Sequence, residues 1–214
     1  IHFPFNEESG STVSSIGSIY GIRATFDTPL WLDSTKSRFG DSCLNFASIS
    51  NYGNVNHSMT SDITKSGTWS FWTQIHRTDN QTFITDYNSI LNNGYHIYSN
   101  NNEIFFNQGS GGANVYTRTN GTLKFNMWHH IGVVKDNNNV NIYLDGVKQS
   151  KVTNGSHVDL VYHNNVMKFG KRNDGANPLL GRLDDLRIYD VALTRAEIKM
   201  LYYNSDIYKK ATTD

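Results

Sequence analysis

The clearest alternation of apolar and polar residues lies between residues 128 and 146, WHHIGVVKDNNNVNIYLDG. Apolar side chains occupy every second position in 131–133 and again in 140–144, a period typical of paired strands with one buried face. The intervening DNNN at 136–139 suits a tight turn, because Asn and Asp tolerate the left-handed backbone. Asp145 and Gly146 predict a second tight turn. The pattern therefore predicts a β-hairpin that ends in another turn.

Shorter stretches with the same period occur along the rest of the chain. In TWSFWTQI at 68–75, Trp69 and Phe71 share one face of a predicted strand. In GRLDDLRIY at 181–189, simple alternation places Asp184, Leu186 and Ile188 on one face. Further short strands are predicted at 1–5, 24–26, 30–32, 38–46, 82–85, 95–98, 103–107, 114–118 and 167–170.

A single helix is predicted at the C-terminal end. Thr194 and Glu197 have the spacing of a capping box, in which each side chain bonds the backbone of the other residue. Ile198, Leu201 and Tyr202 then follow at helical spacing. Many short strands with regular turn signals favour an all-β, two-sheet antiparallel sandwich closed by this helix. We predict one domain over residues 1–204, with residues 205–214 as a tail or linker remnant.

Composition excludes two classes of partner. The 214 residues carry 19 basic and 19 acidic side chains, so the formal net charge is +0. This balance offers no basic field for nucleic acid. No apolar run approaches the roughly 20 residues that span a bilayer, so we expect no membrane insertion.

The lone Cys43 excludes an internal disulfide, and its apolar neighbours predict a buried thiol.

Four motifs together carry a family resemblance. They are F-x-F-x-E-x-S-G at 3–10, the strand from Phe39 to Phe46, the W-H-H…Y-x-D-G hairpin at 128–146, and G-x-L-D-D-L-R-I-Y-x-x-x-L-T-x-x-E-I at 181–198. The sequence resembles the laminin G-like, concanavalin A-like jelly-roll domains over nearly its whole length. The resemblance implies a jelly-roll β-sandwich.

The resemblance also implies a function. We expect a non-catalytic, lectin-like adhesion or receptor-binding module of a larger extracellular, cell-surface or virion-surface protein. Its partner would be a glycan or a glycosylated surface receptor. A second interpretation is a structural module whose sheet edges pair with other chains of an assembly. The third interpretation is a glycoside hydrolase, since the concanavalin A-like fold also hosts these enzymes.

The sequence offers no local support for a glycosidase. Such enzymes use two carboxylates about 5–10 Å apart. None of the residues Glu7, Glu8, Glu103 and Glu197 has an acidic partner two positions away on a predicted strand. Asp184 and Asp185 are adjacent, so their side chains diverge. We therefore expect no enzymatic activity.

The resemblance implies a structural calcium ion that ties the first strand to the last. Its ligands would be Asn6, the carbonyl of Gly40 and Asp184. Calcium takes six to eight oxygen ligands, both carboxylate and carbonyl. A partly buried Asp184 must find a cation or hydrogen-bond donors. The alternative is that Asp184 accepts backbone amides or pairs with a neighbouring arginine.

Sugar binding needs aromatic faces together with planar amides or carboxylates. Turn regions supply the best candidates, because binding loops cluster on rigid scaffolds. Ordinary turn chemistry is the alternative explanation for each of them. The candidates are Asp86, Tyr87, Asn88 and Asn92 in one loop, Asn107, Asn114 and Tyr116 beside a GSGG turn, and Asn173 and Asp174 in a third loop.

The adjacent pair His129 and His130 resembles a metal site, but neighbouring strand residues point to opposite faces. We therefore expect both imidazoles to pack or to form hydrogen bonds instead of sharing one ion.

Overall fold

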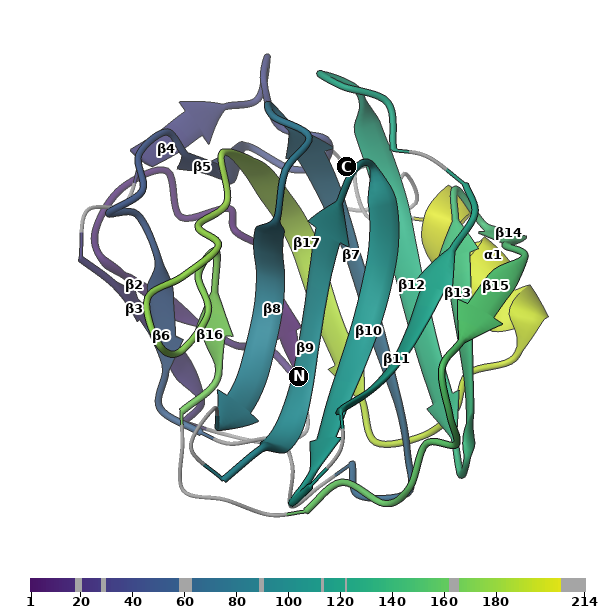
Figure 1. The fold of residues 1–214 in the computed structure, drawn as a ribbon. Coiled ribbons are helices and arrows are strands. Elements are labelled where there is room, and N and C mark those ends of the chain that lie inside the picture. The colour runs from purple at the N-terminus through teal and green to yellow at the C-terminus, as the bar shows by residue number, and fades with distance from the viewer. Residues whose placement is uncertain are drawn as a thin grey trace.

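The computed structural model describes residues 1–17, 21–27, 30–57, 63–88, 91–112, 114–121, 123–161 and 166–204. The predicted tail at 205–214 lies outside these residues. The described chain forms two antiparallel sheets and a short helix, which confirms the predicted all-β sandwich (Figure 1). The elements are β1 His2–Phe3, β2 Thr12–Ser14, β3 Arg23–Phe26, β4 Leu30–Asp33, β5 Ser42–Phe46, β6 Gly53–Val55, β7 Ser66–Ile75, β8 Gln81–Asn88, β9 Asn93–Asn100, β10 Glu103–Ser110, β11 Asn114–Thr119, β12 Trp128–Asp136, β13 Asn139–Leu144, β14 Val147–Lys148, β15 Lys151–Thr153, β16 Lys168–Phe169, β17 Gly181–Tyr189 and α1 Arg195–Asn204.

The strands are divided between an eight-stranded and a nine-stranded sheet. The first has the order β14-β13-β12-β7-β17-β5-β4, with β1 beside β17. The second has the order β15-β11-β10-β9-β8-β16-β6-β3-β2. Figure 1 shows β8, β9, β10 and β11 in front, with the other sheet stacked behind them. The chain therefore crosses repeatedly between the two layers.

The predicted hairpin is present as β12 and β13. Asp136 pairs with Asn139 at its tip, where Asn137 has a positive φ of 50°. Asp145 and Gly146 both have positive φ, 51° and 73°, and connect β13 to β14. These backbone angles explain why Asn, Asp and Gly occupy the two turns.

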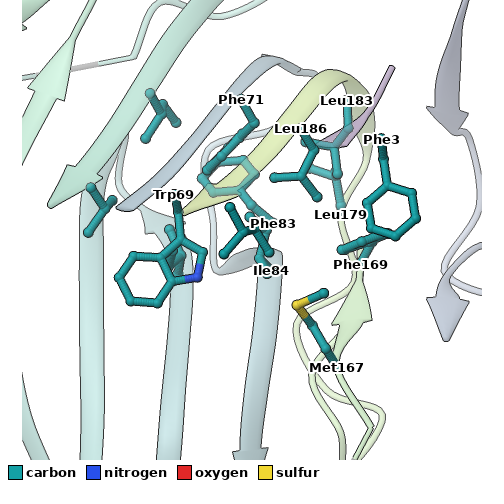
Figure 2. Close-up of a cluster of buried hydrophobic side chains, with 14 of the residues drawn as sticks. Phe3, Trp69, Phe71, Phe83, Ile84, Met167, Phe169, Leu179, Leu183 and Leu186 are labelled. Atoms are coloured by element: carbon teal, nitrogen blue, oxygen red, sulfur yellow. The ribbon is translucent and has the colours of Figure 1, made fainter. Parts of the chain in front are cut away.

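The core lies between the two sheets and is rich in aromatic rings. Trp69 and Phe71 point into it from β7, as their alternation predicts, and both are fully buried. Figure 2 shows them facing Phe83 and Ile84 of the opposite sheet. The ring centroids of Phe71 and Phe83 are 5.4 Å apart. Large rings thus fill the core of a chain whose apolar fraction is only 37%.

The predicted alternation in β17 is wrong at one point. A β-bulge between Asp184 and Arg187 shifts the register, and Asp185 has a φ of 47°. Leu183, Leu186 and Ile188 all point into the core as a result. Asp184 lies opposite Trp72 on the outer side of the sheet. The extra residue of a bulge changes which face the following side chains occupy.

Helix α1 covers part of the outer face of the eight-stranded sheet. Ile198 is fully buried against Val134 and Tyr143. The capping box is present: the Thr194 amide donates to Glu197 Oε2 at 2.7 Å, and the Glu197 amide donates to Thr194 Oγ1 at 3.3 Å. Within the described residues, no helix covers the outer face of the nine-stranded sheet.

Candidate functional site

Aromatic side chains form a continuous row on the outer face of the nine-stranded sheet. Tyr95, Ile97 and Phe106 point into the core, so alternate residues of β9 and β10 point outward. We call the four outward side chains the aromatic row. Consecutive ring centroids are 4.4, 4.8 and 5.8 Å apart in the order His96, Tyr98, Phe105, Tyr116.

Polar groups accompany the aromatic row. Asn107 on β10 lies between His96 on β9 and Tyr116 on β11, as the register of the three strands shows. At the far end of the same face, Arg118 bonds both carboxylate oxygens of Glu103, the closer of them at 2.5 Å. The face thus combines ring surfaces with an amide at its centre and an ion pair at its margin.

The two rings that β9 contributes to the row, His96 and Tyr98, are electrically neutral at physiological pH. Burial lowers the pKa of His96 to about 3, and its Nε2 lies 2.9 Å from the Thr82 hydroxyl. Burial likewise raises the pKa of Tyr98 to about 12. His96, Tyr98 and Phe105 lie nearly parallel, with interplanar angles of 16°, so their faces cover one another and their edges form a fixed apolar surface. Tyr98 and Tyr116 are the half-buried members of the row, and a sugar can contact them.

Tyr87 organises the end of the sheet beside the row. Its hydroxyl contacts Asn92 Oδ1 and lies 3.1 Å from Asn114 Oδ1. Asn173 Nδ2 donates to the Tyr87 carbonyl at 2.8 Å. Asn92 Nδ2 also donates to the Gly112 carbonyl at 2.6 Å. Three loops that were candidates from the sequence therefore meet at Tyr87, through side chains that bond one another.

The remaining sugar-binding candidates have structural roles. Asp86 is fully buried opposite Tyr95, so it points into the core and cannot reach a ligand on the outer face. Asn88 Oδ1 accepts the Leu91 amide at 2.9 Å and closes a turn. Asp174 accepts from Arg172 Nε at 2.9 Å. We therefore build the candidate site on the aromatic row and its neighbouring amides.

Sequence reasoning missed three of the five residues that form the aromatic row and its central amide. It selected Asn107 and Tyr116 but overlooked His96, Tyr98 and Phe105. Strand alternation could have identified Phe105, because Phe105 and Asn107 lie two positions apart on one strand and therefore share a face. Finding the partners on β9 also requires the strand register, which the sequence alone does not provide.

The calcium candidates come from segments that meet around residues 38–41. Asn6 Oδ1 accepts the Asp41 amide at 3.3 Å, and a Cβ added to Gly40 would overlap the Asn6 side chain. Asp184 Oδ2 accepts the amides of Arg38 and Phe39 at 2.8 and 2.9 Å. The alternative that Asp184 binds backbone amides is therefore correct for one of its two oxygens.

The other oxygen of Asp184 is compatible with a cation. Oδ1 is buried without a hydrogen-bond partner among the described residues, and burial raises the pKa of Asp184 to about 8. Oε2 of Glu7, the residue next to Asn6, is also buried without a hydrogen-bond partner among the described residues. Within the described residues, no three acidic, His or Cys side chains cluster as a metal site. A cation here would therefore depend largely on amide and carbonyl oxygens.

The two adjacent histidines have separate structural roles, as predicted. His129 Nδ1 lies 2.8 Å from Asp145 Oδ2, and its Nε2 accepts the Lys124 amide at 2.9 Å. His130 is buried, with Nε2 2.8 Å from the Ser70 hydroxyl. The predicted burial of Cys43 is also confirmed, and burial raises the pKa of its thiol to about 12.

Two packed antiparallel sheets define the class of β-sandwich proteins. A family model described as the concanavalin A-like lectin/glucanases superfamily, Laminin_G_3, matches residues 48–199. Because this span covers most of the sequence, the chain belongs to that superfamily. None of the curated proteins compared with the chain matches it in sequence.

Several solved structures share the fold. The binding domain of Paraclostridial Mosquitocidal Protein 1 matches with a TM-score of 0.71 and 15% identity, over 95% of this chain and 51% of that chain. The botulinum neurotoxin serotype D ligand-binding domain in complex with N-acetylneuraminic acid matches with a TM-score of 0.71 and 15% identity, over 95% of this chain and 50% of that chain. The binding domain of botulinum neurotoxin DC in complex with rat synaptotagmin II matches with a TM-score of 0.71 and 13% identity, over 96% of this chain and 51% of that chain.

These similarities concern the fold alone, because the identities are so low. The chain spans about half the length of the binding domains that it matches. Within the described residues, no helix has both the length and the apolar character needed to cross a bilayer.

Proposed function

We propose that the chain is a non-catalytic binding module that recognises carbohydrate on a surface receptor. The observation that carries the proposal is the aromatic row, with Asn107 at its centre, on a sheet face that α1 does not cover and where Tyr98, Asn107 and Tyr116 remain partly exposed. Aromatic rings and planar amides on a rigid sheet provide apolar contact and directional hydrogen bonds together, which is what a sugar requires.

Acidic side chains around this face support a non-catalytic role. Glycoside hydrolysis needs two carboxylates that converge on one bond. Glu103 is instead bound by Arg118, and Asp174 is bound by Arg172. A chromogenic glycoside assay tests this part of the proposal: turnover by the purified chain would contradict it.

The structural neighbours are consistent with this role. One was solved with N-acetylneuraminic acid and another with a protein receptor, synaptotagmin II. Both are binding domains, and the chain shares their fold at about half their length. A binding module of a larger secreted or surface-exposed protein is the setting that we propose for this chain.

A glycan array tests the proposal directly. We expect wild type to bind a subset of glycans, and we expect Tyr98→Ala and Tyr116→Ala to weaken that binding about tenfold, or ~1.4 kcal/mol. Tyr203→Ala is the matched control, because Tyr203 is a 58% exposed tyrosine on α1, away from this face. It should bind like wild type. Absence of binding to every glycan of a diverse array would contradict carbohydrate binding and favour the assembly interpretation.

Assembly through sheet edges has less support. The edge strands β14, β15, β2 and β4 contain two, three, three and four residues. Short edges present few free backbone groups for strand addition. Light scattering on the purified chain tests this alternative: a concentration-dependent rise in mass would favour it.

We further propose that calcium binds at Asp184, with Asn6 and the Gly40 carbonyl as neighbouring oxygen ligands. The buried Asp184 oxygen without a partner supports this assignment. Bound calcium would neutralise that carboxylate and hold two loops to β17. We expect chelator to lower the melting temperature of wild type and calcium to restore it. Asp184→Asn keeps an oxygen that can accept the backbone amides of Arg38 and Phe39 but removes the charge, so the melting temperature of this variant should not respond to chelator or calcium. A wild-type response in this variant would contradict the assignment.

A further inference from the structure

Two lysines and a tyrosine form a cluster at the side of the aromatic row. Lys168 and Lys171 place their ammonium groups 5.3 and 5.2 Å from the centre of the Tyr52 ring. Phe169 is fully buried in the core, so the preceding residue, Lys168, points to the outer face of β16. All three members of this lysine cluster are partly accessible to solvent.

The strand register connects the lysine cluster to the aromatic row. Lys168 pairs with Thr85 on β8, and Thr85 pairs with His96 on β9. Two strand spacings therefore separate Lys168 from the row, roughly 10 Å. Arg172 is a further cation near the row, and its charge interacts with both Tyr87 and Tyr98. A ligand bound along the row could extend toward these cations.

The acidic groups near the cluster do not neutralise it. Asp27 receives a hydrogen bond from the Tyr52 hydroxyl, and Asp174 is bound to Arg172. Within the part of the chain that the structure describes, neither lysine ammonium lies within ion-pair distance of a carboxylate. Burial lowers the pKa of Lys168 and the neighbouring charge of Lys171 lowers it further, while the charges of Asp27 and Asp174 offset only part of this effect. The two cations thus repel each other, and a bound anion would relieve that repulsion.

We propose that Lys168 and Lys171 form an anion subsite of the carbohydrate-binding face, so that its ligand is a glycan that carries a carboxylate or a sulfate group. This inference rests on the proposed function. The sugar would contact the half-buried rings of Tyr98 and Tyr116, and the acidic group would lie between the two ammonium groups. Lysine binds carboxylate and sulfate as a point charge, so the subsite selects negative charge before it selects shape.

Matched glycan pairs test the subsite. The affinity of wild type is measured for a sialylated glycan and its asialo form, and for a sulfated glycan and its desulfated form. We expect the acidic member to bind at least tenfold more tightly in one pair, and the preferred pair to identify the acidic group. The preference should decrease with added salt, because exposed charges are screened.

Charge-neutral variants complete the test. The double variant Lys168→Gln and Lys171→Gln should lose the acidic preference and retain the affinity for the neutral member. Lys199→Gln is the control, since Lys199 also lies over a tyrosine ring, 5.8 Å from the centre of Tyr203, but on α1. It should keep the preference.

The outcomes separate this inference from the proposed function. Binding of neutral and acidic glycans with equal affinity, or an acidic preference that survives in the double variant, overturns the subsite and leaves carbohydrate binding intact. Absence of binding to every glycan overturns both.

Discussion

The stability of the protein should depend on pH through His130, which is buried below α1. Its Nε2 lies 2.8 Å from Ser70 Oγ, and its ring lies 5.3 Å from Trp72. Burial lowers the pKa of His130 from 6.5 to about 4, and the nearby carboxylates of Asp185 and Asp145 offset only part of this effect. The native protein therefore keeps this imidazole neutral at pH values where the unfolded chain protonates it.

The magnitude follows from the two pKa values. Between pH 6.5 and about 4, the unfolded state binds more protons than the native state, so stability decreases as the pH falls. With one pKa unit worth about 1.36 kcal/mol, His130 alone removes about 2.5 kcal/mol of unfolding free energy between pH 7.5 and pH 4.5. That loss is a large share of a typical domain stability of about 5–15 kcal/mol.

The assay is urea unfolding followed by tryptophan fluorescence at pH 7.5 and pH 4.5. His130→Gln removes the titrating ring. The decrease in unfolding free energy from pH 7.5 to pH 4.5 should therefore be about 2.5 kcal/mol smaller in this variant than in wild type. Ser70→Ala is the control, because it removes the hydroxyl partner but leaves the ring buried; it should keep the wild-type pH dependence. Equal losses in His130→Gln and wild type would refute the reasoning.

Three further substitutions test the fold. Phe71→Ala in the core should cost about 3–5 kcal/mol of unfolding free energy, measured by urea titration, because it leaves a cavity beside Phe83; a cost below about 1 kcal/mol would contradict the packing. Gly170→Ala should cost more than about 1–2 kcal/mol, since Gly170 has a φ of 75° and an added Cβ would overlap Phe46; an unchanged melting temperature would argue against this backbone conformation. Thr194→Ala should cost about 1 kcal/mol through the lost helix cap, and calorimetry that detects no loss would show that the cap is not formed in solution.

Local patterns predicted the fold well because each strand carries its own signal. The hairpin at 128–144 has alternating faces and a turn sequence that only a few backbone conformations satisfy. Thr194 and Glu197 predicted the helix start in the same way. The alternation in β17 misled the prediction, because a bulge at Asp185 inserts one residue without any distinct sequence signal.

The candidate site was harder to predict because it depends on contacts between strands. Tyr87, Asn92, Asn114 and Asn173 were selected as loop residues that bind a ligand, yet they bond one another and hold three loops together. The row of rings arises only when β9, β10 and β11 are placed in register. Register follows from the whole sheet, so no short stretch of sequence encodes it.

The distribution of charge shows a similar limit. The net charge of +0 excluded a basic field over the whole molecule. It did not exclude a local cluster, and Lys168 and Lys171 lie together on Tyr52 because β16 and the following loop bring them there. Composition constrains the average surface, whereas recognition depends on how a few groups are placed.

An NMR titration with the glycan that the array ranks tightest tests the central claim most directly, because it locates the bound ligand residue by residue. We predict that amide shift changes concentrate on β9, β10 and β11, around Tyr98, Phe105, Asn107 and Tyr116. Shift changes confined to the eight-stranded sheet and α1, or no saturable changes anywhere, would contradict the account.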